Sequence, residues 1–148
     1  MKPDLSRFLE VACAHLMLKV APALPVSYGQ ADANLLGVML TVVGEEAERA
    51  AARRVDENAA LRELFGEAAP VVTDAGLRGR LQEASRGADE SLRVSDLELR
   101  NASLRGLLVE LHAHVEALDT PEARRIDDAI WSELVASTER RKLAIGPF

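Results

Sequence analysis

Two histidines in a predicted helix, His112 and His114, are the side chains whose type and spacing best suit metal binding. Residues two apart on a helix point about 200° apart, so these two histidines cannot share one ion on that helix. Each has a carboxylate four residues away, Glu116 for His112 and Glu110 for His114, and each such pair could supply two ligands. A zinc site needs three or four ligands. We therefore predict helix-surface ion pairs at these positions, with no metal site and no cofactor.

The common catalytic signatures do not occur in the sequence. There is no Gly-x-Ser-x-Gly nucleophile motif and no glycine-rich phosphate loop of either common type. The single cysteine, Cys13, lies in an apolar stretch with no basic residue directly beside it, which is typical of a packed core thiol and not of an activated nucleophile. We predict no catalytic residue, and we expect a non-enzymatic protein.

Two polar residues, Asp32 and Asn34, lead into a strongly apolar segment over residues 35–43. Both residue types are unfavourable inside a helix because their side chains compete for backbone groups. One interpretation is that Asp32, or Ser27 before it, caps the helix that follows. The other is that these side chains contact a ligand or a partner near the start of that helix.

A third polar residue, Asn101, interrupts an apolar seam in which residues recur at alternating steps of three and four. The seam consists of Val94, Leu97, Leu104, Leu108, Leu111, Val115 and Leu118. An asparagine in such a seam fixes register or oligomeric state in coiled coils, and the alternative is ligand contact with Arg100 or Arg105 at the rim. Asn34 and Asn101 could also pair across two helices. The candidate ligand-binding residues are therefore Asp32, Asn34, Asn101, Arg105 and His112.

Apolar periodicity predicts helices along the whole chain and no strand. The expected helices cover residues 4–20, a segment from Ser27 or Gln30 to 58, a short turn over 59–65, a short helix after Asp74, 91–118, and a last helix from Pro121 until Gly146 and Pro147 stop it. Asp4, Asp74 and Thr120 are the expected N-caps. We predict an all-α antiparallel helical bundle of four to six helices, with residues 1–148 forming a single domain.

The second predicted helix has two unlike halves. Residues 35–43 are apolar nearly all round, so this half needs cover either inside the bundle or from a second subunit. Residues 45–58 are strongly charged and alanine-rich, and we expect them to face solvent on most sides. The seam over 94–118 then organises the rest of the bundle.

Composition excludes several classes of function. The net charge of −6 disfavours binding to nucleic acid or to an anionic membrane, and 3% aromatic residues leave few rings on which bases could stack. The longest apolar run is about half of the roughly 20 residues that a membrane helix needs. The start of the chain lacks the apolar core of a secretory signal, and one cysteine fits a reducing compartment. We expect a cytoplasmic protein.

The N-terminal half resembles a bacterial family of uncharacterised helical domains associated with phosphotransferase-like and acyl-CoA dehydrogenase-like proteins. The residues that carry the resemblance are Phe8-Leu9, the segment from Lys19 to Leu24, and Ala33-Asn34-Leu35-Leu36. The resemblance covers about 45 residues and implies a helical accessory domain. It supplies no catalytic residues.

The favoured interpretation is a non-enzymatic helical interaction or accessory protein that self-associates, with a homodimer or another protein partner. It depends on the apolar segment over 35–43 and on the missing catalytic signatures. The alternative is a small-molecule-binding bundle, or an enzyme, with a pocket between the helices that carry Asn34 and Asn101.

Overall fold

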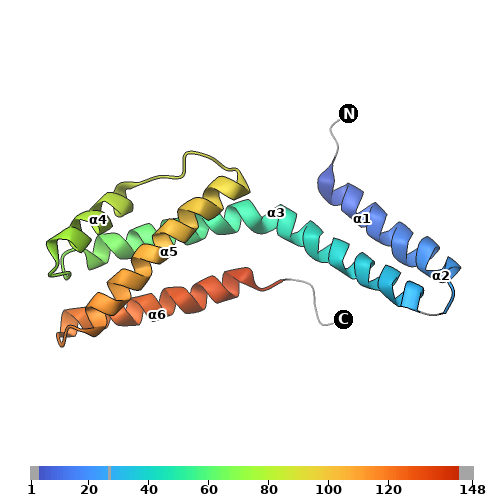
Figure 1. Cartoon of the computed structure of the whole chain (residues 1–148). Coiled ribbons are helices and arrows are strands. Elements are labelled where there is room, and N and C mark those ends of the chain that lie inside the picture. Colours follow the sequence, from blue (N-terminus) through green and yellow to red (C-terminus); the bar gives the residue numbers. More distant parts are fainter. Residues whose placement is uncertain (1–3, 27, 144–148) are drawn as a thin grey trace. The chain divides into compact units, whose positions relative to one another are not determined.

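Figure 1 shows the computed structural model of the chain, which describes residues 4–26 and 28–143. Helices form nearly all of this part of the chain and no strand occurs in it, so the predicted all-α helical bundle is confirmed. No helix within the described ranges is both long and apolar enough to cross a membrane.

The chain forms two compact units. Among the described residues, the N-terminal unit comprises 4–26, 28–50 and 143, and the C-terminal unit comprises 51–142. The long helix α3 (Tyr28–Ala68) contributes its first part to one unit and its last part to the other. The single domain over residues 1–148 stays a prediction.

In the N-terminal unit, three helical segments follow one another before a turn leads into α3 (Figure 1). They are α1 (Leu5–His15), the π-helix η1 (Leu16–Val20) and the short α2 (Ala21–Ala23). Asp4 caps α1 as predicted, because its side chain accepts a hydrogen bond from the Arg7 backbone N–H. The helical path ends at Ala23, three residues later than predicted, since Pro22 is tolerated at an early position of the last turn.

The segment from α1 to α2 (residues 5–23) and the first part of α3 (residues 28–50) form the two arms of a helical hairpin, which we call the N-terminal hairpin. The two arms approach each other closely at glycines of α3. A Cβ atom added to Gly37 would lie 2.4 Å from the Met17 Cγ atom, and one added to Gly44 would lie 3.7 Å from a Leu9 methyl carbon. The missing side chain at Gly37 therefore makes room for Met17. These contacts define the side of α3 that faces α1.

The C-terminal unit is built from the end of α3 with α4 (Ala75–Arg86), α5 (Val94–Glu116) and α6 (Pro121–Arg141), and consecutive helices run in opposite directions (Figure 1). Large side chains from all four helices form its core. They include Leu61, Phe65, Leu81, Leu111 and Ile130. Every seam residue of α5 from Leu97 to Val115 is buried, as the three-and-four spacing predicts.

The turns of this unit follow the predicted signals. The Asp74 carboxylate accepts a hydrogen bond from the Leu77 N–H at the start of α4, and the Thr120 hydroxyl accepts one from the Ala123 N–H at the start of α6.

The predicted break near residue 58 was wrong, because α3 continues without interruption to Ala68. The predicted cap Ser27 and the predicted stop at Gly146 and Pro147 lie outside the described residues.

Candidate functional site

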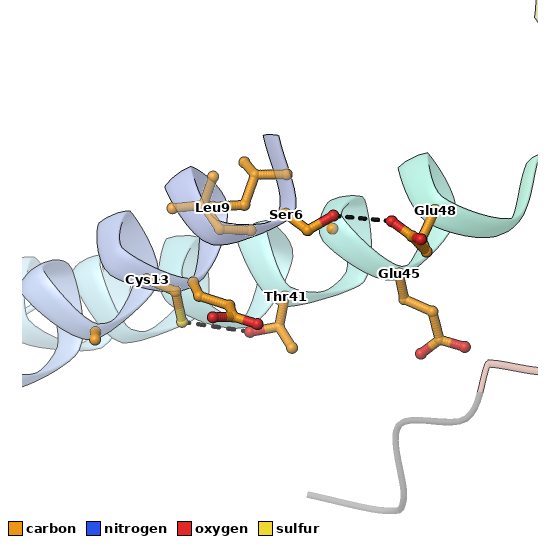
Figure 2. A pocket seen from close by; sticks show the side chains of 10 residues that line it. Ser6, Leu9, Cys13, Thr41, Glu45 and Glu48 are labelled. Carbon is orange, nitrogen blue, oxygen red and sulfur yellow. Dashed lines mark hydrogen bonds between the residues drawn. The ribbon is translucent and has the colours of Figure 1, made fainter. Parts of the chain in front are cut away.

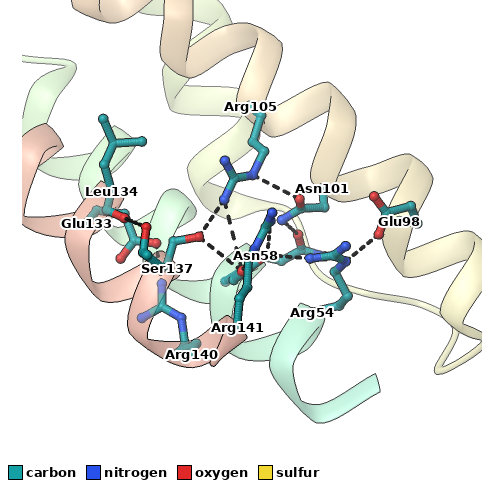
Figure 3. A network of polar contacts seen from close by, with 12 residues as sticks. Arg54, Asn58, Glu98, Asn101, Arg105, Glu133, Leu134, Ser137, Arg140 and Arg141 are labelled. Carbon is teal, nitrogen blue, oxygen red and sulfur yellow. Dashed lines mark hydrogen bonds and ion pairs between the residues drawn. The ribbon is translucent and has the colours of Figure 1, made fainter. Parts of the chain in front are cut away.

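A buried polar network connects α3, α5 and α6 of the C-terminal unit (Figure 3). We use this name for Glu57, Asn58, Asn101, Arg105, Ser137 and Arg141. Glu57 and Asn58 are fully buried, and Asn101 and Ser137 are no more than 4% exposed. Burying this many polar groups is costly unless each finds a partner. The hydrogen-bond and ion-pair partners of these groups therefore indicate what the network does.

The Glu57 carboxylate lies at the centre of the network. Arg141 donates to it from Nε at 2.9 Å and from Nη2 at 3.1 Å, and Arg54 donates from Nη1 at 2.8 Å. The Ser137 hydroxyl adds a hydrogen bond of 3.1 Å, and an Arg105 nitrogen lies 4.0 Å away.

Burial alone would raise the pKa of Glu57. The hydrogen bond and charge of Arg141, the Ser137 hydroxyl and the charge of Arg54 together outweigh it and lower the pKa to about 2. Glu57 is therefore a carboxylate at neutral pH. A carboxylate held this far below its usual pKa cannot serve as a general acid at neutral pH, so its surroundings fit an ion-pair role.

A chain of amides extends the network. The Asn101 side-chain NH₂ donates to the Asn58 carbonyl oxygen at 3.0 Å, and Arg105 donates to the Asn101 oxygen at 3.1 Å. Asn58 in turn donates to Asp89 at 3.1 Å, and Asp89 pairs with Arg62 at 2.6 Å. The hydrogen bond from Arg62 lowers the pKa of Asp89 against the effect of its burial. The Asn101 amide thus pairs with Asn58 and Arg105, in place of the predicted pairing with Asn34.

The candidate ligand-binding residues divide between the two units. Asp32 and Asn34 lie in the N-terminal unit and are exposed, and Asn101, Arg105 and His112 lie in the C-terminal unit. The structure brings Asn101 and Arg105 together in one hydrogen bond. The capping role expected of Asp32 was wrong, because α3 begins at Tyr28 and Asp32 falls within the helix.

The two histidines of α5, His112 and His114, have different partners. His112 Nε2 lies 2.9 Å from an Asp127 oxygen of α6 and 3.6 Å from the Glu116 oxygen one turn further along α5. The predicted His112–Glu116 pair is therefore present, with Asp127 as a second carboxylate. His114 contacts Thr73 instead, at 3.2 Å from both its backbone N and its hydroxyl. Sequence spacing missed Asp127 because it lies on the next helix.

The expected pair of Glu110 with His114 was wrong. Glu110 binds Arg80 of α4, with the two guanidinium nitrogens at 2.9 and 2.5 Å from its oxygens. The arginine offers a bidentate geometry that an imidazole does not, and its hydrogen bonds lower the pKa of Glu110. Both side chains are about half exposed, so this ion pair lies on the surface of the C-terminal unit.

A groove of about 600 Å³ lies between α1 and α3 in the N-terminal unit (Figure 2). Leu9, Cys13 and Leu40 are among its apolar lining residues, and Glu10, Glu45 and Glu48 supply carboxylates. The Cys13 sulfur lies 3.3 Å from the Thr41 hydroxyl and 3.2 Å from the Gly37 carbonyl oxygen. Cys13 is only partly buried and lines this groove, so the predicted packed core position was wrong. Ser6 donates to Glu48 across the groove at 2.9 Å.

The N-terminal unit differs from the C-terminal unit in how little it buries. Among its described residues, the buried hydrophobic ones are all alanines, namely Ala21, Ala33 and Ala50. Ten larger apolar side chains are instead half or more exposed. These are Leu5, Phe8, Val11, Leu18, Val26, Tyr28, Leu35, Leu36, Met39 and Val43. The described part of this hairpin therefore has no buried core of large side chains.

Comparison with models of known protein families, with curated proteins and with solved structures found no match. The family resemblance of the N-terminal half stays a prediction.

Proposed function

We propose that this protein is a non-enzymatic helical accessory protein that self-associates through its N-terminal hairpin. The observation that carries the proposal is the set of large apolar side chains that the hairpin leaves exposed. Exposed apolar surface of this extent is typical of interaction sites on proteins. The C-terminal unit, which has a full core, would then be the part that the hairpins bring together in pairs.

Four exposed apolar residues in the first part of α3 form what we call the apolar stripe: Leu35, Leu36, Met39 and Val43. Their spacing of one, three and four residues places them on one face of the helix. Gly37 faces α1, and the centre of the stripe lies about 150° around the helix from it. The other arm of the hairpin therefore cannot cover the stripe, and each stripe residue is more than half exposed.

A second copy of this chain is the partner we propose for the stripe. In a two-fold contact the same segment meets itself, so like charges at its centre would repel. Residues 35–43 contain no charged residue, which suits such a contact. Two hairpins would also supply the four helices from which a stable bundle core is built.

The exposed apolar area of the hairpin can be compared with the area that a standard interface buries. Full burial of a Leu- or Met-sized side chain corresponds to roughly 60–120 Å² at about 25 cal/mol per Å². Ten side chains that are half or more exposed then offer on the order of 600 Å². A standard interface buries about 600–1,000 Å² per partner. All ten side chains together would reach the lower end of that range, and the four stripe residues supply roughly 130–250 Å² of it.

Sedimentation velocity over a micromolar concentration series tests the proposal. We expect the wild-type chain to sediment as a dimer and Leu36→Asp and Met39→Asp each to weaken the dimer about 100-fold or more, because each buries an unpaired charge. Leu99→Asp is the matched control, since Leu99 is 73% exposed but lies in the C-terminal unit. A dimer that survives both stripe variants would overturn the proposal, as would a wild-type monomer.

A further inference from the structure

A cluster of metal-binding side chains lies between α5 and α6. His112 and Glu116 stand one turn apart on α5, and Asp127 projects from α6 toward the same imidazole. One ligand atom from each of the three lies within 4.8 Å of the others. Two helices thus bring together a ligand set that neither contains alone.

The spacing of these atoms suits a transition metal ion. With bonds of about 2.0–2.2 Å and tetrahedral angles, two ligand atoms of a zinc ion lie roughly 3.4 Å apart. His112 Nε2 is 2.9 Å from the Asp127 oxygen and 3.6 Å from the Glu116 oxygen, which bracket that value. Glu116 is 61% exposed, so its side chain has room to rotate into place. One imidazole and two carboxylates are ligands that zinc accepts.

The surrounding structure holds the imidazole in position. The Trp131 ring packs edge to face against His112, with ring centroids 5.4 Å apart and planes at 86°. Trp131 lies one turn after Asp127 on α6, so the same helix face supplies both the ligand and the packing. Leu111 beside His112 and Ile126 beside Asp127 are buried in the core, which fixes the two helices at this point. His112 and Asp127 are therefore already in place for binding, and the Glu116 side chain is the ligand that would rotate.

We propose that His112, Glu116 and Asp127 form a binding site for a divalent transition metal, with zinc as the best-matched ion and its remaining coordination position open to water. Catalytic zinc sites have this pattern of three protein ligands and one open position. The inference is independent of self-association, because all three ligands lie in the C-terminal unit.

Calorimetric titration of the full-length protein with Zn²⁺ tests the site. A parallel titration with Co²⁺ is followed by the fluorescence of Trp131, which is the single tryptophan of the chain and touches the proposed ligand. We expect one Zn²⁺ per chain and quenching of Trp131 by Co²⁺. His112→Ala and Asp127→Asn should each weaken binding tenfold or more. The matched controls, His114→Ala and Cys13→Ser, should bind as the wild type does.

Two results would overturn the site. One is the absence of Zn²⁺ binding by the wild type up to about 1 mM. The other is an unchanged dissociation constant in both His112→Ala and Asp127→Asn, which would place any bound ion elsewhere. Circular dichroism of each variant separates a lost ligand from a lost fold, since a folded variant keeps the wild-type helical spectrum.

Discussion

The substitution Glu57→Gln tests the buried polar network most sharply. Glutamine keeps the shape of the side chain but removes the charge that Arg54 and Arg141 share. Arg54 and Arg141 would then face a neutral amide. Its NH₂ group is a hydrogen-bond donor, so it cannot accept the hydrogen bonds that the guanidinium groups donate. Removing one partner of a buried ion pair lowers the free energy of unfolding by more than the pair contributes, because the other charge is left buried without a partner.

The magnitude follows from the pKa of Glu57. A shift from 4.5 to about 2 corresponds to about 3 kcal/mol of stability at neutral pH. Because the folded pKa is below the unfolded one, this contribution is complete above roughly pH 5 and is lost as the pH falls toward 2. About 2 kcal/mol of it should be gone by pH 3.

Urea unfolding at pH 7 and pH 3, followed by Trp131 fluorescence, measures the effect in the C-terminal unit. We expect Glu57→Gln to lower the free energy of unfolding by about 3 kcal/mol at pH 7 and to differ far less from the wild type at pH 3. Glu63→Gln is the control: Glu63 is exposed on the same helix, so a change within about 0.5 kcal/mol is expected. A Glu57→Gln variant as stable as the wild type at pH 7, or equally destabilised at both pH values, would refute the reasoning.

Two further pairs of substitutions test the packing and the caps. Gly37→Ala should lower the thermal stability of the hairpin because its Cβ would meet Met17, whereas Gly106→Ala, with no atom within 4 Å, should gain up to about 1 kcal/mol from helix propensity. Melting followed by circular dichroism compares them, and a Gly37→Ala variant more stable than the wild type would contradict the close approach. Thr120→Ala should cost about 1 kcal/mol in urea unfolding and Thr120→Ser much less, since serine keeps the capping oxygen. Equal losses in the two variants would exclude a capping role.

Local signals in the sequence predicted most of the fold. The caps Asp4, Asp74 and Thr120 and the seam of α5 depend on residues a few positions apart, and each is confirmed by hydrogen bonds or burial. Such features are decided by helix geometry, which the sequence carries directly. The sequence predicted one helix across the apolar and charged halves of α3 but ended it near residue 58 with a separate short turn over 59–65, whereas α3 continues to Ala68.

The buried polar network was not predictable in the same way. The segment before Asn58 is rich in arginine and acidic residues, so we expected it to face solvent, but Glu57 and Asn58 are fully buried. What allows this is Arg141, a partner 84 residues away in the sequence, together with Asn101, 43 residues away. Asp127 of the His112 cluster was missed for the same reason. Pairs formed across helices leave no trace in local spacing.

Light scattering of the wild-type protein at increasing micromolar concentration tests the central claim most directly. Self-association through the hairpins predicts a molar mass that rises toward about 32 kDa, twice the 16.0 kDa of one chain. A mass that stays near 16.0 kDa at every concentration would contradict it.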